Sequence, residues 1–168
     1  MARNSFRAPT RRAFLGALCG GAALLLVGCA GSADQQPAAT TPPRSGLADY
    51  AGLASGASVP FPGYVTAALR DAYQFAVDRP AVLKALPCYC GCGLTSGHRS
   101  NLDCFIAGAR ADGTVVFDDH ASFCQTCLDI ARDARGLLAD GKTLKEIRTT
   151  IDERHGGKGP GTETPKPA

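Results

Sequence analysis

The sequence predicts a small, mainly α domain of about three helices, with a cysteine-rich loop and a short β-hairpin insert. Three observations lead to this prediction. Apolar residues recur at helical spacing in three stretches between residues 62 and 156. Runs of β-branched and aromatic residues flank Ala111-Asp112-Gly113, which is typical of a hairpin turn. Between the first helical stretch and the hairpin, Pro87-Cys88-Tyr89-Cys90-Gly91-Cys92-Gly93 places three thiols in five residues.

The first 28 residues have the features of an export signal. Thr10-Arg11-Arg12-Ala13-Phe14-Leu15 is typical of a twin-arginine signal, and an apolar run extends from Ala13 to Gly28. Leu26-Val27-Gly28-Cys29 resembles a bacterial lipobox. We therefore expect a signal peptide over residues 1–28, cleavage before Cys29, and acylation of that cysteine with a lipid such as palmitate. The chain would then lie on the extracytoplasmic face of the cell membrane. The alternative is an ordinary signal peptide with an unmodified Cys29.

The charge of the remaining chain excludes one class of partner. Removing residues 1–28 takes away four arginines and no acids, so Lys+Arg falls from 18 to 14 against 15 Asp+Glu. The net charge becomes about −1, and no basic stretch is interleaved with aromatic residues. We expect no nucleic-acid partner.

Composition divides the mature chain into three parts. Residues 29–57 are rich in small and polar residues, which predicts a lipidated cysteine followed by a flexible tether. Residues 58–156 contain the apolar periodicity and six of the eight cysteines, so they form the predicted cysteine-rich, metal-binding domain. Residues 157–168 are dominated by Pro, Gly, Thr and Lys, which predicts a disordered tail.

The helical stretches have recognisable ends. The first is predicted to begin at Pro62-Gly63 and to end before Pro80, because a residue that precedes proline disfavours the helical conformation. The second is predicted over 120–139 and ends at Gly141. A third helix should begin with a capping box formed by Thr143 and Glu146.

The start of the second helix is open on sequence grounds. Asp118 or Asp119 could cap it, which would place His120, Cys124 and Cys127 at i, i+4 and i+7 on one face. A competing capping box begins at Ser122 and would start the helix later.

The thiols and imidazoles predict a soft-metal site. More ligands are present than the four that one structural zinc ion needs. Thiolate-rich sites select Cu(I), zinc and iron–sulfur clusters, and the spacing does not match ferredoxin patterns. We therefore favour Cu(I), with zinc as second choice, held for buffering or for exchange with a metal donor or acceptor protein. The predicted thiolate ligands are Cys88, Cys90, Cys92, Cys104, Cys124 and Cys127, and His98 and His120 are the auxiliary imidazoles.

Two other interpretations of the cysteines remain open. Six cysteines in an exported domain could form three disulfides, for which fifteen pairings exist. Alternatively, Cys124 and Cys127 could form a redox pair, because the dipole at a helix start lowers a thiol pKa and favours attack by the thiolate. No Ser/His/Asp arrangement, carboxylate pair or phosphate loop is present, so an enzyme that catalyses turnover is the less favoured class.

Two resemblances add to these patterns. The stretch Pro87–Cys92, together with Gly97-His98, Asp103–Ile106 and His120-Ala121 followed by Cys124 and Cys127, resembles the PCYCGC-motif lipoproteins of bacteria. This resemblance implies a membrane-anchored exported protein whose six cysteines function as a set. More locally, residues 124–156 are similar to CcmH, the thiol-reductase module of cytochrome c maturation. This similarity implies a small three-helix module with a C-x-x-C at a helix start, although this chain has four further cysteines.

Overall fold

The computed structural model describes residues 44–54 and 56–168, all of which belong to one compact unit over residues 37–168. The predicted signal peptide and Cys29 lie outside the described residues. Among the helices within the described ranges, none has the length and apolarity needed to cross a membrane.

The described residues contain six α-helices, one 3₁₀ helix and a two-stranded antiparallel sheet. The predicted helices and hairpin insert are therefore present, with short helices added to the expected three. Their bounds are α1 (Arg70–Asp78), α2 (Pro80–Lys84), α3 (Cys92–Thr95), η1 (Leu102–Cys104), β1 (Ile106–Ala109), β2 (Val115–Phe117), α4 (His120–Phe123), α5 (Gln125–Ala139) and α6 (Leu144–His155).

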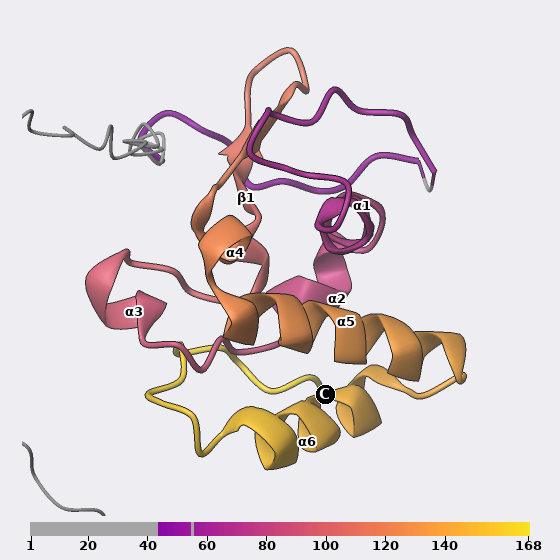
Figure 1. Ribbon diagram of the computed structural model, residues 1–168, viewed down its shortest axis with the longest axis vertical. Coiled ribbons are helices and arrows are strands. Elements are labelled where there is room, and N and C mark those ends of the chain that lie inside the picture. The colour runs from indigo at the N-terminus through magenta and orange to yellow at the C-terminus, as the bar shows by residue number, and fades with distance from the viewer. Residues whose placement is uncertain (1–43, 55) are drawn as a thin grey trace, which may run out of the picture. The chain divides into compact units, whose positions relative to one another are not determined.

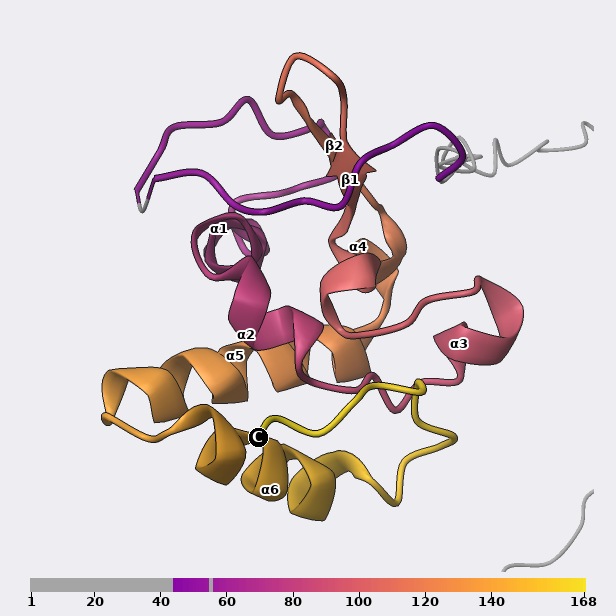
Figure 2. The same ribbon diagram turned by 180° about the vertical axis from the view of Figure 1, so that it is seen from behind.

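The helices form layers around α5. In both views α5 lies between α6 on one side and the α1–α2 pair on the other (Figures 1 and 2). Helix α6 begins with the predicted capping box, in which Thr143 Oγ1 accepts from the Glu146 N–H and the Glu146 carboxylate accepts from the Thr143 N–H. Ile147 and Ile151 of α6 are fully buried, so apolar burial holds this helix in place.

Helix α1 begins later than predicted. Residues 62–69 form successive turns, in which Val65 N–H bonds to Pro62 O and Leu69 N–H bonds to Thr66 O. Proline and glycine at positions 62 and 63 favour such turns over a regular helix. Tyr73, at the centre of α1, is fully buried, and its ring meets that of Phe105 edge-on at 5.1 Å.

The predicted hairpin pairs Ile106 with Phe117 and Ala109 with Val115. The turn between the strands closes with a bond from Arg110 N–H to Thr114 O at 2.9 Å. Ala48 forms two backbone hydrogen bonds with Ala109, both 3.0 Å long, and so extends the sheet by an isolated bridge. The sheet is therefore supported by a segment that was predicted to be a tether.

The prediction of a flexible tether is wrong for the described residues from 44 onwards. Tyr50 is buried, and its hydroxyl donates to Val77 O in α1. Arg44 reaches Asp118 at 3.0 Å. Small and polar composition predicted a tether, but the contacts of Arg44 and Tyr50 hold this segment against the domain.

The prediction of a disordered tail is also wrong. Thr162 and Thr164 are buried against the domain. Thr162 N–H donates to Cys88 O, and Thr162 Oγ1 accepts from Cys88 N–H, both at 3.0 Å. The Arg148 guanidinium donates to Thr164 O and Pro165 O at 3.1 and 3.2 Å. The tail is thus held by specific hydrogen bonds to α6 and to the cysteine loop, and not by apolar composition.

We predict that Thr162→Val destabilises the reduced full-length protein by about 1–3 kcal/mol, because the buried Cys88 N–H loses its acceptor. Urea unfolding monitored by circular dichroism measures the change. The matched control is Thr149→Val, since Thr149 lies on the exposed side of α6; this variant should stay within about 0.5 kcal/mol of the parent. Equal stability of the two variants would contradict the role assigned to the tail.

Candidate metal centre

The predicted cysteine-rich loop is present and turns back on itself. Gly91 has φ +84°, a conformation that favours glycine, and the short helix α3 begins immediately after it at Cys92. The sulfurs of Cys88, Cys90 and Cys92 consequently lie within 4.8 Å of one another, with Cys88 and Cys90 3.3 Å apart. One short loop thus supplies three converging thiols.

The second group of ligands lies where α4 gives way to α5. The prediction of one continuous helix over 120–139 is wrong, because Cys124 is extended (φ −117°, ψ 101°) and separates the two helices. Neither the i, i+4, i+7 stripe nor the Ser122 capping box is formed: His120 starts α4, Cys124 is the N-cap of α5, and Cys127 lies in its first turn. Their ligand atoms still come within 4.8 Å of one another and of the Cys90 sulfur.

The third group comes from the segment before the hairpin. Cys104 ends η1 and is fully buried. Its sulfur lies 3.3 Å from His98 Nδ1 and 3.6 Å from the Cys92 sulfur. Asn101, also fully buried, donates to Cys127 O at 3.3 Å and so ties this segment to α5.

The structure brings all eight predicted ligand residues together. They fall into four groups, each of which could hold a metal ion: Cys90, His120, Cys124 and Cys127; Cys88, Cys104 and Cys127; Cys88, Cys90 and Cys92; and Cys92, His98 and Cys104. All six cysteines within the described residues are free thiols. The ligand role of each residue remains a prediction from chemistry and spacing.

The sulfurs differ in their readiness to ionise. Contact with Cys104, then with Cys127, lowers the pKa of Cys88 to about 4. Contacts with Cys104 and then Cys124 lower the pKa of Cys90. Burial and then contact with Cys127 raise the pKa of Cys104. The lowered pKa values of Cys88 and Cys90 favour thiolate formation within the metal-free cluster, and a thiolate favours binding of a cation.

His120 is coupled to these sulfurs. Its Nε2 lies 3.5 Å from the Cys90 sulfur. Hydrogen bonding with Cys124 and then with Cys90 raises the pKa of His120 to about 10. In the absence of metal, the protonated imidazole of His120 thus supplies the positive charge beside the thiolates.

Sequence reasoning assigned Asp118 only to helix capping and missed its part in the site. Asp118 is fully buried, with one oxygen 3.0 Å from Arg44 and 3.6 Å from His98 Nε2, and the other accepting from the His120 N–H. Burial tends to raise the pKa of Asp118, but His98, the His120 N–H and Arg44 together hold it below its ordinary value. No sequence pattern links Arg44 to a carboxylate so far along the chain.

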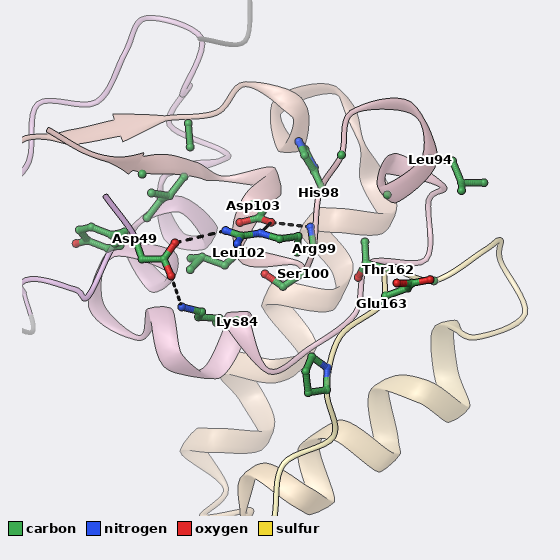
Figure 3. A pocket seen from close by; sticks show the side chains of 18 residues that line it. Asp49, Lys84, Leu94, His98, Arg99, Ser100, Leu102, Asp103, Thr162 and Glu163 are labelled. Carbon is green, nitrogen blue, oxygen red and sulfur yellow. Dashed lines mark hydrogen bonds and ion pairs between the residues drawn. The ribbon is translucent and has the colours of Figure 1, made fainter. Parts of the chain in front are cut away.

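A cavity of about 710 Å³ borders the site without opening onto the sulfurs (Figure 3). Its lining includes His98 and no cysteine. At one side of the cavity Asp49 forms ion pairs with Lys84 at 3.0 Å and with Arg99 at 3.4 Å, as the dashed lines in Figure 3 show. The cavity therefore lies beside His98 and is not the place where the ligands converge.

Comparison with known protein families shows the family of the chain. Residues 20–167 match the family described as "Protein of unknown function with PCYCGC motif", so the chain belongs to this family. No curated protein and no solved structure matches the chain. The local similarity to CcmH consequently stays an expectation from residues 124–156.

We predict that the His120 ring of the reduced, metal-free protein titrates near pH 10 and not near its ordinary value of 6.5. Because the folded-state pKa is raised, the stability gained from this proton is complete below about pH 6.5 and is lost as the pH rises through about 10. An NMR titration of the ring protons measures the midpoint. A midpoint near 6.5 would show that the ring does not interact with the thiolates.

Proposed function

We propose that this protein is an exported lipoprotein, anchored to the membrane through acylated Cys29, that binds a soft metal ion for buffering or delivery. Cu(I) is the favoured ion and zinc the second choice. The observation that carries the proposal is the convergence of six thiols and two imidazoles from three separate segments onto one interior region.

The kind of ligand favours Cu(I). Two of the groups consist of sulfur alone, and the group of Cys88, Cys104 and Cys127 is entirely buried. A sulfur-rich, water-excluded environment suits a soft monovalent ion. Zinc remains second because Cys90, Cys124, Cys127 and His120 together make a Cys₃His set, a known composition of structural zinc sites.

One edge of the cluster is suited to exchange with another protein. Cys90, Cys124 and His120 are only half-buried. Phe123 lies beside them with 69% of its surface exposed, and its ring centroid is 5.3 Å from that of His120. These half-buried ligands are the part of the cluster that a metal donor or acceptor protein could reach.

Thiol–disulfide exchange is the second candidate. Cys124 is half-buried at the N-cap of the 15-residue helix α5, and Cys127 lies in its first turn. A helix N-terminus stabilises a thiolate, and the two sulfurs lie within 4.8 Å of each other. An exchange enzyme would depend on this pair alone, whereas a metal site would also depend on Cys88, Cys90 and Cys92.

We predict that the reduced full-length chain, purified without oxygen in mild detergent, contains stoichiometric copper or zinc after growth with both metals. A parent with Cys19→Ser and Cys29→Ser leaves the six clustered thiols for titration. Replacing Cys88, Cys90 and Cys92 together by serine should remove the metal, as measured by elemental analysis.

A second measurement covers the case in which the triple variant does not fold. Metal is stripped from the parent with a chelator and added back, and circular dichroism before and after confirms the fold. A folded, reduced parent that takes up neither metal would overturn the proposed function. Loss of disulfide exchange on Cys124→Ser in that metal-free parent would support the redox candidate.

The membrane anchor is tested separately. We predict that the exported protein partitions into the detergent phase of a Triton X-114 extract and is labelled by a palmitate analogue. Cys29→Ser should abolish the label and move essentially all of the protein to the aqueous phase, because a lipid chain contributes about 0.8 kcal/mol per buried methylene. Cys19→Ser is the matched control. Equal partitioning of the two variants would contradict the anchor.

A further inference from the structure

Seven of the eight ligand residues form two sets of different accessibility. The outer set is Cys90, His120, Cys124 and Cys127, of which three are half-buried; the inner set is Cys92, His98 and Cys104, all of which are buried. The two sets share no residue. Each set on its own contains sulfur and imidazole within 4.8 Å.

One ion cannot use both sets. A tetrahedral ion such as zinc is satisfied by four ligands, which the outer set supplies completely, and a Cu(I) ion needs no more than that. The inner set would then be left as a preformed, empty group, with Cys104 3.6 Å from Cys92 and 3.3 Å from His98. Within this group the buried Nε2 of His98 has no hydrogen-bond partner among the described residues, and a buried polar atom without a partner is costly.

The inner histidine is oriented as a metal ligand is. Its Nδ1 faces the Cys104 sulfur, and its Nε2 faces the Asp118 carboxylate at 3.6 Å. A ligating histidine usually directs its other ring nitrogen at a carboxylate, which fixes its tautomer and orientation. Arg44 and the His120 N–H hold that carboxylate in turn. The arrangement thus includes the supporting interactions of a metal site.

Cys88 connects the two sets. Its sulfur lies 3.3 Å from those of Cys90 and Cys127 on the outer side. On the inner side it lies within 4.8 Å of Cys92 and of Cys104. A thiolate in this position can bind two ions at once through its lone pairs, and its backbone is fixed on both sides by Thr162.

We propose that the centre is dinuclear: it holds an outer and an inner Cu(I) ion, with the Cys88 thiolate as the bridge. This inference rests on the proposed function. It adds the number of ions bound and a different role for each ion. The outer ion lies at the half-buried edge and exchanges with a partner. The inner ion lies among buried ligands and is retained.

The test is an anaerobic Cu(I) titration of the reduced full-length parent (Cys19→Ser, Cys29→Ser) against a chromophoric Cu(I) chelator, with X-ray absorption of the loaded sample. We expect saturation at about two ions per chain and a copper–copper scattering path. The His98→Asn/Cys104→Ser variant should saturate at about one ion and lose that path. His155→Asn, at a buried histidine outside all four ligand groups, is the control and should keep about two.

The outcomes separate this inference from the proposed function. Saturation of the parent at about one ion would overturn the dinuclear centre and leave soft-metal binding intact. Two ions without a copper–copper path would overturn the bridge. A folded parent that binds no Cu(I) would overturn the copper assignment on which the inference rests. The titration and spectrum of the parent carry the test even if the double variant does not fold.

Discussion

The contact between the sulfurs of Cys88 and Cys127 joins two segments that are 39 residues apart, and the rest of the cluster is built around it. Asn101 fixes the Cys127 carbonyl, while Thr162 pairs with the backbone of Cys88 on both its N–H and its C=O. Neither backbone segment can move far without breaking buried hydrogen bonds, which are costly to leave unsatisfied. The backbone thus holds the ligands close together before any ion arrives.

The aromatic core and the sulfur cluster share Asp118. Its carbonyl accepts from the Tyr73 hydroxyl at 2.9 Å, and its carboxylate is held by Arg44 and by the His120 N–H. The same carboxylate faces His98. A buried carboxylate is tolerated only when it is paired and hydrogen-bonded, so its partners are part of the stability of the domain. Stability and ligand orientation therefore depend on the same few polar contacts.

The sequence allowed prediction of features whose signals lie within a few residues. The capping box of Thr143 and Glu146 and the cysteine loop are of this kind. The break at Cys124 was missed because local spacing favours a continuous helix, and only the path of the folded chain shows the extended residue. Contacts such as that between Thr162 and Cys88 are 74 residues apart and leave no periodic pattern. Composition alone therefore misassigned the tail as disordered.

The contact between Thr162 and Cys88 closes a loop of 74 residues. Contacts so distant along the chain form late in folding, because the entropy of closing the loop is lost before the contact stabilises the chain. The cysteine loop therefore reaches its final geometry only when the segment around Thr162 has docked. Until then its thiols are open to oxidants and to competing ions, so the order of folding and metal loading decides what occupies them.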